Sequence, residues 1–265
     1  MDRKRRRLCL LASLLVVLLI IILGVVLGLT LNRDRDPLKR TFLDRCGKFK
    51  EYDCQNVWSI FEQAYVNKDP CNVPPEAYHP LIAAAPIIPA CNRMMFWSKT
   101  KDVVHDFTNK RDCFITMEDT LLGSVLDGLR WCGEEGSTET FTTDCPGWSD
   151  CVNNPVRSFW NSVSAAFAKA ACGQVTTMLN GSIDTPYSPS SVFASIEVKN
   201  LNSTTVQKLN VVLVIQKNAV TNCTNASLEN LKKDLGEIQY DCKEVPESQI
   251  QECASDPEKP CGSCW

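Results

Sequence analysis

Carboxylates and tryptophans are the side chains of this chain whose type and spacing could support chemistry. Glu197 lies between Ile196 and Val198 in an apolar segment. Alternation along a strand places Phe193, Ser195 and Glu197 on one face, where a carboxylate could stabilise a developing positive charge. The same pattern fits the solvent side of an edge strand, so the residues alone leave both interpretations open.

Two tryptophans are each accompanied by a serine. Trp160 and Ser164, four residues apart, share one face of a predicted helix, which brings a stacking ring and a hydroxyl close together. Trp97 and Ser98 begin another predicted helical segment. Either tryptophan could equally be a core residue, because large aromatic rings are highly buried on average.

Acidic residues lie along a third predicted helix, residues 116–131. Glu118 and Asp119 stand at its start, where acidic side chains also simply favour a helix N-terminus, and Asp127 follows later. Nine residues of regular helix turn Glu118 and Asp127 to opposite sides. They can share a pocket only if Glu118 lies at or before the first turn, or if Gly123 interrupts the helix.

Other kinds of site find little support. The two histidines, His79 and His105, are far apart, so we predict no metal site. Cys261 and Cys264 stand in an irregular tail, where a structural disulfide is favoured over a zinc or redox pair. The first seven residues hold five basic residues and one acidic one, so the net charge of −3 becomes −7 beyond them. Such a charge argues against a nucleic-acid partner.

Helices and a small sheet are needed to position these side chains. Apolar residues at helical spacing predict helices over residues 56–65, 97–107, 116–131, 154–172 and 227–235. Apolar runs rich in β-branched residues predict strands over 192–198, 209–215 and 238–245. We expect an α/β (α+β-like) fold of two lobes, one helical and N-terminal, the other C-terminal with a small parallel sheet flanked by helices.

The start of the chain predicts a membrane anchor. Leu8 to Leu31 has no charged residue, and its 24 residues span roughly 36 Å of helix, enough to cross a bilayer. The basic cluster before it keeps the N-terminus in the cytoplasm. We predict a cytoplasmic tail at 1–7, a signal anchor at 8–31, a stalk at 32–44 and an ectodomain at 45–265. The protein would be a single-pass type II protein of the cell membrane with its C-terminus extracellular.

Cysteines and glycosylation sequons agree with that topology. The chain has 15 cysteines, of which only Cys9 precedes the ectodomain, so an even number remains for disulfides in an oxidising compartment. Four sequons for N-glycosylation begin at Asn180, Asn202, Asn222 and Asn225. Which of the four carry a glycan is left open.

Several long motifs resemble the ADP-ribosyl cyclase / cyclic ADP-ribose hydrolase family, closest to its type II membrane member on lymphocytes. The resemblance runs from about Cys46 to Cys261. Its most specific stretches include Thr116-x-Glu-Asp-Thr-Leu-Leu-Gly, Leu129-x-Trp-Cys-Gly133, Asn153-Asn-Pro-Val-x-x-Phe-Trp-x-x-Val-Ser164 and Ser195-Ile-Glu-Val-x-Asn-Leu201. The resemblance implies an ectoenzyme that cleaves NAD to nicotinamide and ADP-ribose and also forms and hydrolyses cyclic ADP-ribose. NAD is then a substrate, and no cofactor is implied.

The resemblance also implies roles for individual residues. Glu197 would be the anion beneath the ribose cation, with Trp160 and Trp97 as aromatic walls and Glu118 holding the nicotinamide amide. Substrate-binding roles would fall on Ser98, Lys99, Lys101, Asp127, Ser164 and Phe193. Lys101 matches the family lysine linked to hydrolysis of cyclic ADP-ribose. Lys99 stands where family members often have Arg, and Val192 where they often have Thr.

Disulfide pairs follow from the same resemblance. They would be 46–54, 71–151, 91–172, 132–145, 223–242 and 253–261. Cys91 and Cys172 match a pair that the family associates with the hydrolase step. Cys113 and Cys264 find no family partner, and we expect them to bridge each other.

One alternative of another class stays open, a cell-surface receptor or adhesion domain that uses the same scaffold without catalysis. Protein ligands, product ratio and homo-oligomer formation are not determined by the sequence.

Overall fold

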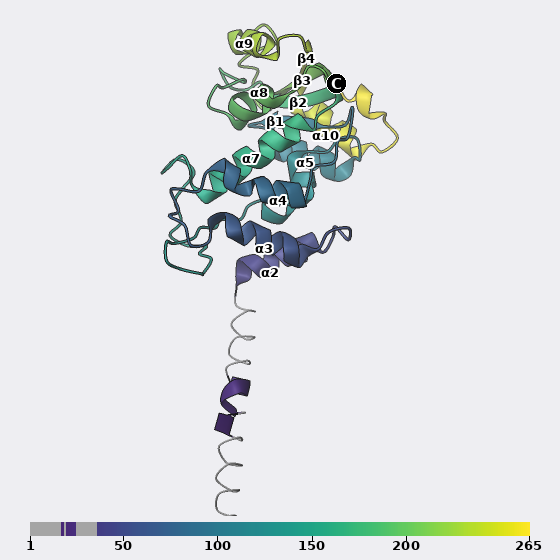
Figure 1. Cartoon of the computed structure of the whole chain (residues 1–265). Helices are drawn as coiled ribbons and strands as arrows, with labels where there is room; N and C mark the ends of the chain where they lie inside the picture. The colour runs from purple at the N-terminus through teal and green to yellow at the C-terminus, as the bar shows by residue number, and fades with distance from the viewer. Residues whose placement is uncertain (1–16, 19, 25–35) are drawn as a thin grey trace, which may run out of the picture.

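The computed structural model describes residues 17, 18, 20–24 and 36–265 (Figure 1). The α-helices are α2 (Pro37–Cys46), α3 (Cys54–Tyr65), α4 (His79–Ala84), α5 (Lys101–Lys110), α6 (Leu121–Leu126), α7 (Pro155–Lys169), α8 (Val198–Asn200), α9 (Ala226–Leu235) and α10 (Glu247–Ser255). Short 3₁₀ turns are η1 (Pro75–Tyr78), η2 (Met117–Asp119) and η4 (Cys261–Ser263), and η3 (Phe193–Glu197) is π-helical. The strands are β1 (Met95–Ser98), β2 (Gly173–Asn180), β3 (Val206–Ile215) and β4 (Gln239–Pro246).

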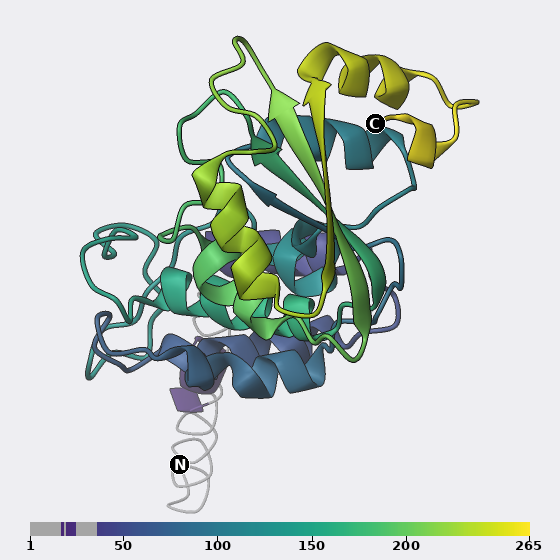
Figure 2. The same ribbon diagram turned by 90° about the horizontal axis from the view of Figure 1, so that it is seen from above.

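The four strands form one parallel sheet in the order β1-β2-β3-β4. Both faces are covered, as a parallel sheet requires. On one face, Met178 and Val212 pack with α5 and α10, and on the other, Leu179 and Leu213 pack with α7, η3 and α9. Figure 2 shows α9 and α10 on opposite sides of the strands. The predicted parallel sheet is confirmed.

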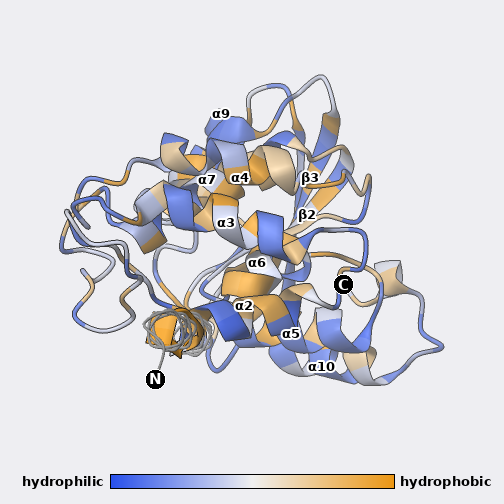
Figure 3. Ribbon diagram, turned by 60° about the horizontal axis from the view of Figure 1, so that its bottom comes forward, coloured by the Kyte–Doolittle hydropathy of each residue, from blue (hydrophilic) through white to orange (hydrophobic). Residues whose placement is uncertain are grey.

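A second core lies among the helices of the N-terminal half. Phe61 of α3 is fully buried and contacts the rings of Phe42, Trp131 and Phe159 at centroid distances of 5.7, 5.2 and 6.4 Å. Figure 3 shows that α6, which joins this core, is mostly apolar. Because α7 contributes to this core and to the core beside the sheet, it connects the two layers.

The strand predicted over residues 192–198 is wrong, because this segment is helical in η3 and α8. The hydroxyl oxygen of Ser191 accepts a hydrogen bond from the Ala194 amide at 3.1 Å, as a capping side chain does. Helical geometry buries Phe193, Ala194 and Glu197 together. A seven-residue segment with five apolar residues fits either periodicity, and because the segment is helical the alternation argument for Glu197 does not apply.

Two other element predictions need correction. The segment 97–107, predicted helical, begins as the end of β1 and becomes helix only at Lys101. The strand β2, which follows directly after the helix predicted to end at residue 172, was not predicted from the sequence. The helix predicted over 116–131 is two short pieces, η2 and α6, which together end at Leu126.

Other predicted elements are confirmed with small shifts at their ends. The helices expected over 56–65, 154–172 and 227–235 are α3, α7 and α9, and the strands expected over 209–215 and 238–245 are β3 and β4. Asn154 caps α7, and Thr116 with Asp119 forms the predicted capping box.

Seven disulfides close the described domain. Five predicted pairs are confirmed: 46–54, 71–151, 91–172, 132–145 and 223–242. The predicted pairs 253–261 and 113–264 are wrong, because Cys113 pairs with Cys261 and Cys253 with Cys264. Phe107 and Phe114 hold the ring of Trp265 at 5.3 and 5.6 Å, which places Cys264 beside α10 and leaves Cys261 for Cys113.

The N-terminal predictions fall mostly outside the described residues. This holds for the tail at 1–7 and for the anchor at 8–31, of which residues 17, 18 and 20–24 are described and helical. Within the described residues, no helix has the length and apolar character needed to span a bilayer. Of the stalk predicted at 32–44, the part from Pro37 onward is α2, whose Leu38 and Phe42 are buried. The folded domain thus begins at α2 rather than at residue 45.

Gly123 is the residue that allows η2 to lie against α6. A Cβ atom at Gly123 would come within 2.1 Å of the Met117 carbonyl oxygen and 2.7 Å of the Glu118 Cα. We expect Gly123→Ala to lower the free energy of unfolding by about 1–3 kcal/mol, the usual cost of overpacking. Thermal unfolding measures the change. Gly262→Ala is the matched control, since a Cβ there meets nothing within 4 Å, and equal melting temperatures for both variants would contradict the prediction.

Candidate active site

A cavity of about 670 Å³ opens where β1 ends, between the sheet and the helical half of the domain. This volume lies in the range of small-molecule sites, and the carboxyl ends of parallel strands are where open α/β sheets bind ligands. The cavity is lined by all ten residues predicted for catalysis or substrate binding: Trp97, Ser98, Lys99, Lys101, Glu118, Asp127, Trp160, Ser164, Phe193 and Glu197. The structure thus gathers residues that are separated by as many as 100 positions in the sequence.

Glu197 is the buried carboxyl group of the cavity, with 7% of its surface exposed. It lies at the end of η3, beside α7. Burial raises the pKa of Glu197 to about 8, and the charge of Glu118 acts in the same direction, while a hydrogen bond from Ser164 opposes the rise in pKa. A carboxylate in this position is poorly solvated, so its ionised form is favoured by a nearby positive charge.

Glu118 and Trp97 form a pair across the cavity. The indole Nε1 of Trp97 donates a hydrogen bond to Oε2 of Glu118 at 3.2 Å. The capping box fixes the turn that carries Glu118, since the Thr116 amide donates to Oδ2 of Asp119 at 2.7 Å. The ring of His105 contacts Trp97 edge-on at a centroid distance of 5.8 Å. Contacts with neighbouring residues therefore fix the positions of Glu118 and Trp97.

Asp127 reaches the same cavity as Glu118, despite their nine-residue separation. Glu118 lies in η2, before α6 begins, and Asp127 directly follows the last residue of α6. Glu118 therefore lies before the first turn of α6, which is the condition under which it can share a pocket with Asp127. Lys101 Nζ forms an ion pair with Oδ1 of Asp127 at 3.0 Å, and Arg45 donates to the Asp127 carbonyl at 2.7 Å.

Helix α7 supplies Trp160 and Ser164 on one face, as their spacing predicts. The rings of Phe159 and Trp160 contact each other edge to face, with their centroids 5.1 Å apart. Since Phe159 belongs to the apolar core, the core supports this wall of the cavity. The Ser164 hydroxyl lies 3.3 Å from the Met117 sulfur, and Met117 also lines the cavity. These contacts fix α7 against η2.

The end of β1 presents Ser98 and Lys99 to the cavity mouth. Ser98 is buried, whereas Lys99 is exposed and has φ of 58°, a left-handed conformation uncommon for a residue other than glycine. Asn180 Nδ2 donates to the Lys99 carbonyl at 3.2 Å, and the Thr100 hydroxyl donates to the Met178 carbonyl at 2.9 Å. Neighbouring β2 thus holds this turn in place.

Two prominent cavity residues, Arg130 and Trp148, were not predicted from the sequence. Trp148 lies in the loop between Cys145 and Cys151, and it is 43% exposed. Its only sequence signal is an aromatic residue in a short cysteine-bounded loop. Arg130 directly precedes the core residue Trp131 and carries no signal of its own.

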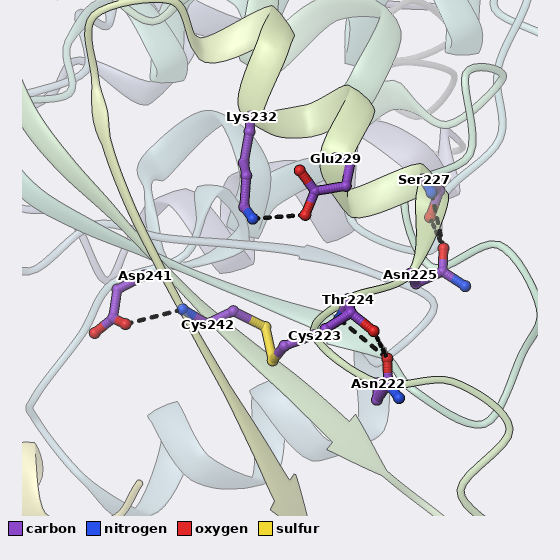
Figure 4. Close-up of polar contacts among 9 residues, drawn as sticks. All are labelled: Asn222, Cys223, Thr224, Asn225, Ser227, Glu229, Lys232, Asp241 and Cys242. Atoms are coloured by element: carbon purple, nitrogen blue, oxygen red, sulfur yellow. Dashed lines mark hydrogen bonds and ion pairs between the residues drawn. A yellow bond between two sulfur atoms is a disulfide. The ribbon is translucent and has the colours of Figure 1, made fainter.

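Some predicted site residues lie away from the cavity. Cys91 and Cys172 form a disulfide and are absent from its lining, as are the four sequon asparagines. Asn202 and Asn222 are exposed, and Asn180 and Asn225 are partly buried. Figure 4 shows that Oδ1 of Asn222 accepts hydrogen bonds from Thr224, with the Cys223–Cys242 disulfide beside it. Glycosylation at the four positions stays a prediction.

In the part of the chain that the structure describes, no group of three or more His, Cys, Asp or Glu side chains is placed to hold a metal ion.

Comparison with known proteins gives one consistent result. A family model described as ADP-ribosyl cyclase matches residues 35–262. The chain is 36% identical over 219 residues to ADP-ribosyl cyclase/cyclic ADP-ribose hydrolase 1 of Rattus norvegicus, which covers 80% of this chain and 72% of the relative. It is 32% identical over 240 residues to ADP-ribosyl cyclase/cyclic ADP-ribose hydrolase of Aplysia kurodai, with 83% and 84% covered.

Solved structures agree with the sequence comparison. Porcine CD38 with a covalent intermediate, ribo-F-ribose-5′-phosphate, has a TM-score of 0.75 and 33% identity, and the match covers 80% of this chain and 96% of that one. Aplysia cyclase complexed with substrate NGD and product cGDPR has a TM-score of 0.75 and 29% identity, with 84% and 94% covered. With the family model matching most of the chain, this protein belongs to the ADP-ribosyl cyclase family.

Proposed function

We propose that the protein cleaves the bond between nicotinamide and ribose in NAD, giving nicotinamide and ADP-ribose, and that it also forms and hydrolyses cyclic ADP-ribose. The observation that carries this proposal is the buried carboxyl of Glu197 in a cavity walled by Trp97 and Trp160. The family membership supports the reaction class, since the named relatives are ADP-ribosyl cyclases and cyclic ADP-ribose hydrolases. NAD acts as substrate, and the reaction needs no separate cofactor.

The reaction fits this arrangement of charges. Nicotinamide leaves as a neutral molecule from a cationic ring, so no general acid has to protonate it. The ribose then develops positive charge, and the Glu197 carboxylate stabilises that charge at close range in a site with little water. A cation beside Glu197 favours the ionised carboxylate, which offsets the cost of burying it.

The other cavity residues position the two ends of the substrate. Trp160 and Trp97 stack on its flat rings, which holds the glycosidic bond over Glu197. Glu118, oriented by its hydrogen bond from Trp97, and Asp127 bind the nicotinamide amide, because carboxylates accept the amide hydrogens.

The pyrophosphate lies in the middle of NAD, between its two riboses. Ser98, Ser164 and Phe193 surround the ribose and phosphates, and Lys99 supplies positive charge at the cavity mouth. Lys101, paired with Asp127, acts on cyclic ADP-ribose. Product partition would depend on whether water or the adenine ring attacks the ribose, and Glu118 lies near enough to Glu197 to affect that choice electrostatically.

The active site faces the outside of the cell in this proposal. The apolar segment 8–31 anchors the chain as a type II membrane protein, and the basic residues before it keep the N-terminus in the cytoplasm. The seven disulfides support an oxidising compartment for the catalytic domain.

Replacement of the central carboxylate tests the mechanism. We expect Glu197→Gln to reduce nicotinamide release by at least roughly 10²–10³-fold, the effect of losing one preorganised electrostatic group. The fold should remain, because an amide has nearly the same shape. Nicotinamide release from NAD by the purified domain measures the activity, and Glu229→Gln, at an exposed position of α9, is the control. A Glu197→Gln variant with most of its activity would refute the assigned role.

The buried carboxyl also predicts a dependence of stability on pH. The pKa of Glu197 is about 8 in the folded protein and 4.5 as an ordinary value, so between these pH values only the unfolded chain releases the proton. Stability from this group is therefore fully present below about pH 4.5 and is lost as pH rises to about 8. Glu197→Gln removes the effect.

Thermal unfolding of both proteins from pH 5 to pH 9 measures this difference. Relative to wild type, Glu197→Gln should gain melting temperature as pH rises, by an amount equivalent to about 1.4 kcal/mol per pH unit at most. A constant difference across the range would show that Glu197 titrates normally.

Replacement of Lys99 tests the proposed contact between this residue and the phosphates of NAD. An arginine can contact a phosphate with two parallel hydrogen bonds, whereas lysine provides a point charge. We expect Lys99→Arg to lower KM for NAD several-fold, with kcat nearly unchanged. Lys110→Arg, at the far end of α5, is the control, and an unchanged KM in Lys99→Arg would place Lys99 outside the phosphate site.

A further inference from the structure

The loop of residues 145–154 forms one wall of the cavity, and the mechanism above does not use it. Pro146 and Trp148 of this loop line the cavity. The guanidinium of Arg157 lies over the Trp148 ring, 5.9 Å from its centroid. With 43% of its surface exposed, Trp148 is not held by a core, so another contact has to fix its position.

Asn154 provides that contact from inside the protein. It is fully buried, and its Nδ2 donates to the carbonyl oxygens of Gly147, Trp148 and Cys151 at 3.3, 3.2 and 2.8 Å. Its Oδ1 accepts a hydrogen bond from the Arg157 amide at 2.9 Å and so caps α7. A single amide group therefore joins the backbone of the loop to the start of the helix.

The disulfides of the loop do not replace this connection. Cys132–Cys145 and Cys71–Cys151 fix the two ends of the segment that contains Trp148, but neither contacts its middle. Within that segment, Asp150 Oδ2 accepts from the Gly147 amide at 2.7 Å, which closes a local turn without linking it to α7.

Helix α7 carries the other aromatic wall. Trp160 lies one and a half turns after the cap, on the same helix that Asn154 begins. Asn154 therefore links the backbone at Trp148 to the helix that carries Trp160. We infer that Asn154 is a positioning residue, which holds Trp148 opposite Trp160 so that the two indoles bind the planar ring of the substrate between them. This inference rests on the proposed NAD-cleaving function.

The test removes the amide donor and keeps the helix cap. Serine caps helices about as well as asparagine, but it is too short to reach the three loop carbonyls. We expect Asn154→Ser to raise KM for NAD about three- to tenfold, as for the loss of one aromatic contact, with kcat changed less than about twofold. Asn153→Ser is the matched control, because the Asn153 side chain makes no hydrogen bond to any residue that the structure describes.

Two more variants separate positioning from general destabilisation. Trp148→Ala should raise KM by a similar factor, and the double variant Trp148→Ala/Asn154→Ser should raise it no further, since both act on one contact. Asn154→Asp keeps the cap and places an oxygen against the three carbonyls. Its KM should be raised at pH 8 and lower at pH 5, where a protonated carboxyl can donate again.

The outcomes are distinct. Wild-type KM in Trp148→Ala, or in a folded Asn154→Ser, overturns the inference, as does an additive double variant. If Asn154→Ser does not fold, a pH-independent KM in Asn154→Asp overturns it instead. If the wild type and Asn153→Ser both fail to release nicotinamide from NAD, the proposed function fails, whatever the loop does.

Discussion

The buried carboxyl group of Glu197 dominates the electrostatics of the active site. A carboxylate with so little access to water is unfavourable unless a positive charge lies beside it. Among the described residues no basic side chain lowers the pKa of Glu197, and the one charge that acts on it, that of Glu118, is also negative. The structure therefore leaves the stabilisation of this charge to the bound substrate.

The architecture explains how such a group can be held. Glu197 ends a π-helical turn that packs against both α7 and the sheet, so its backbone has little freedom. Trp97 and Ser98 come from the edge strand β1, and Glu118 from a turn fixed by its own capping box. Trp97 and Ser98 thus lie at the carboxyl end of a strand, which is where a parallel sheet presents its ligand site.

The sequence predicted the chemistry of the site better than its geometry. Motifs named ten residues that the structure gathers in one cavity, because side-chain type carries that information directly, but they missed Arg130 and Trp148. The helical state of residues 192–198 could not be predicted, since five apolar residues in a segment of seven fit two periodicities and the Ser191 cap favours the helix. The pairing of Cys113 and Cys261 depends on where the tail docks, and β2 on strands far away in the sequence. Such long-range contacts leave no local pattern.

The position of β1 in the sheet affects how the protein folds while it is being synthesised. It can join the sheet only beside β2, which begins about 75 residues later in the chain. At ribosomal speeds of about 5–20 residues per second, the tryptophan-bearing edge waits roughly 4–15 seconds for its neighbour to emerge. During that interval the apolar residues of β1 lack their neighbouring strand, and an unpaired strand edge is prone to aggregation. The strand that carries Trp97 into the active site is thus also a point at which newly made chains are at risk of aggregation.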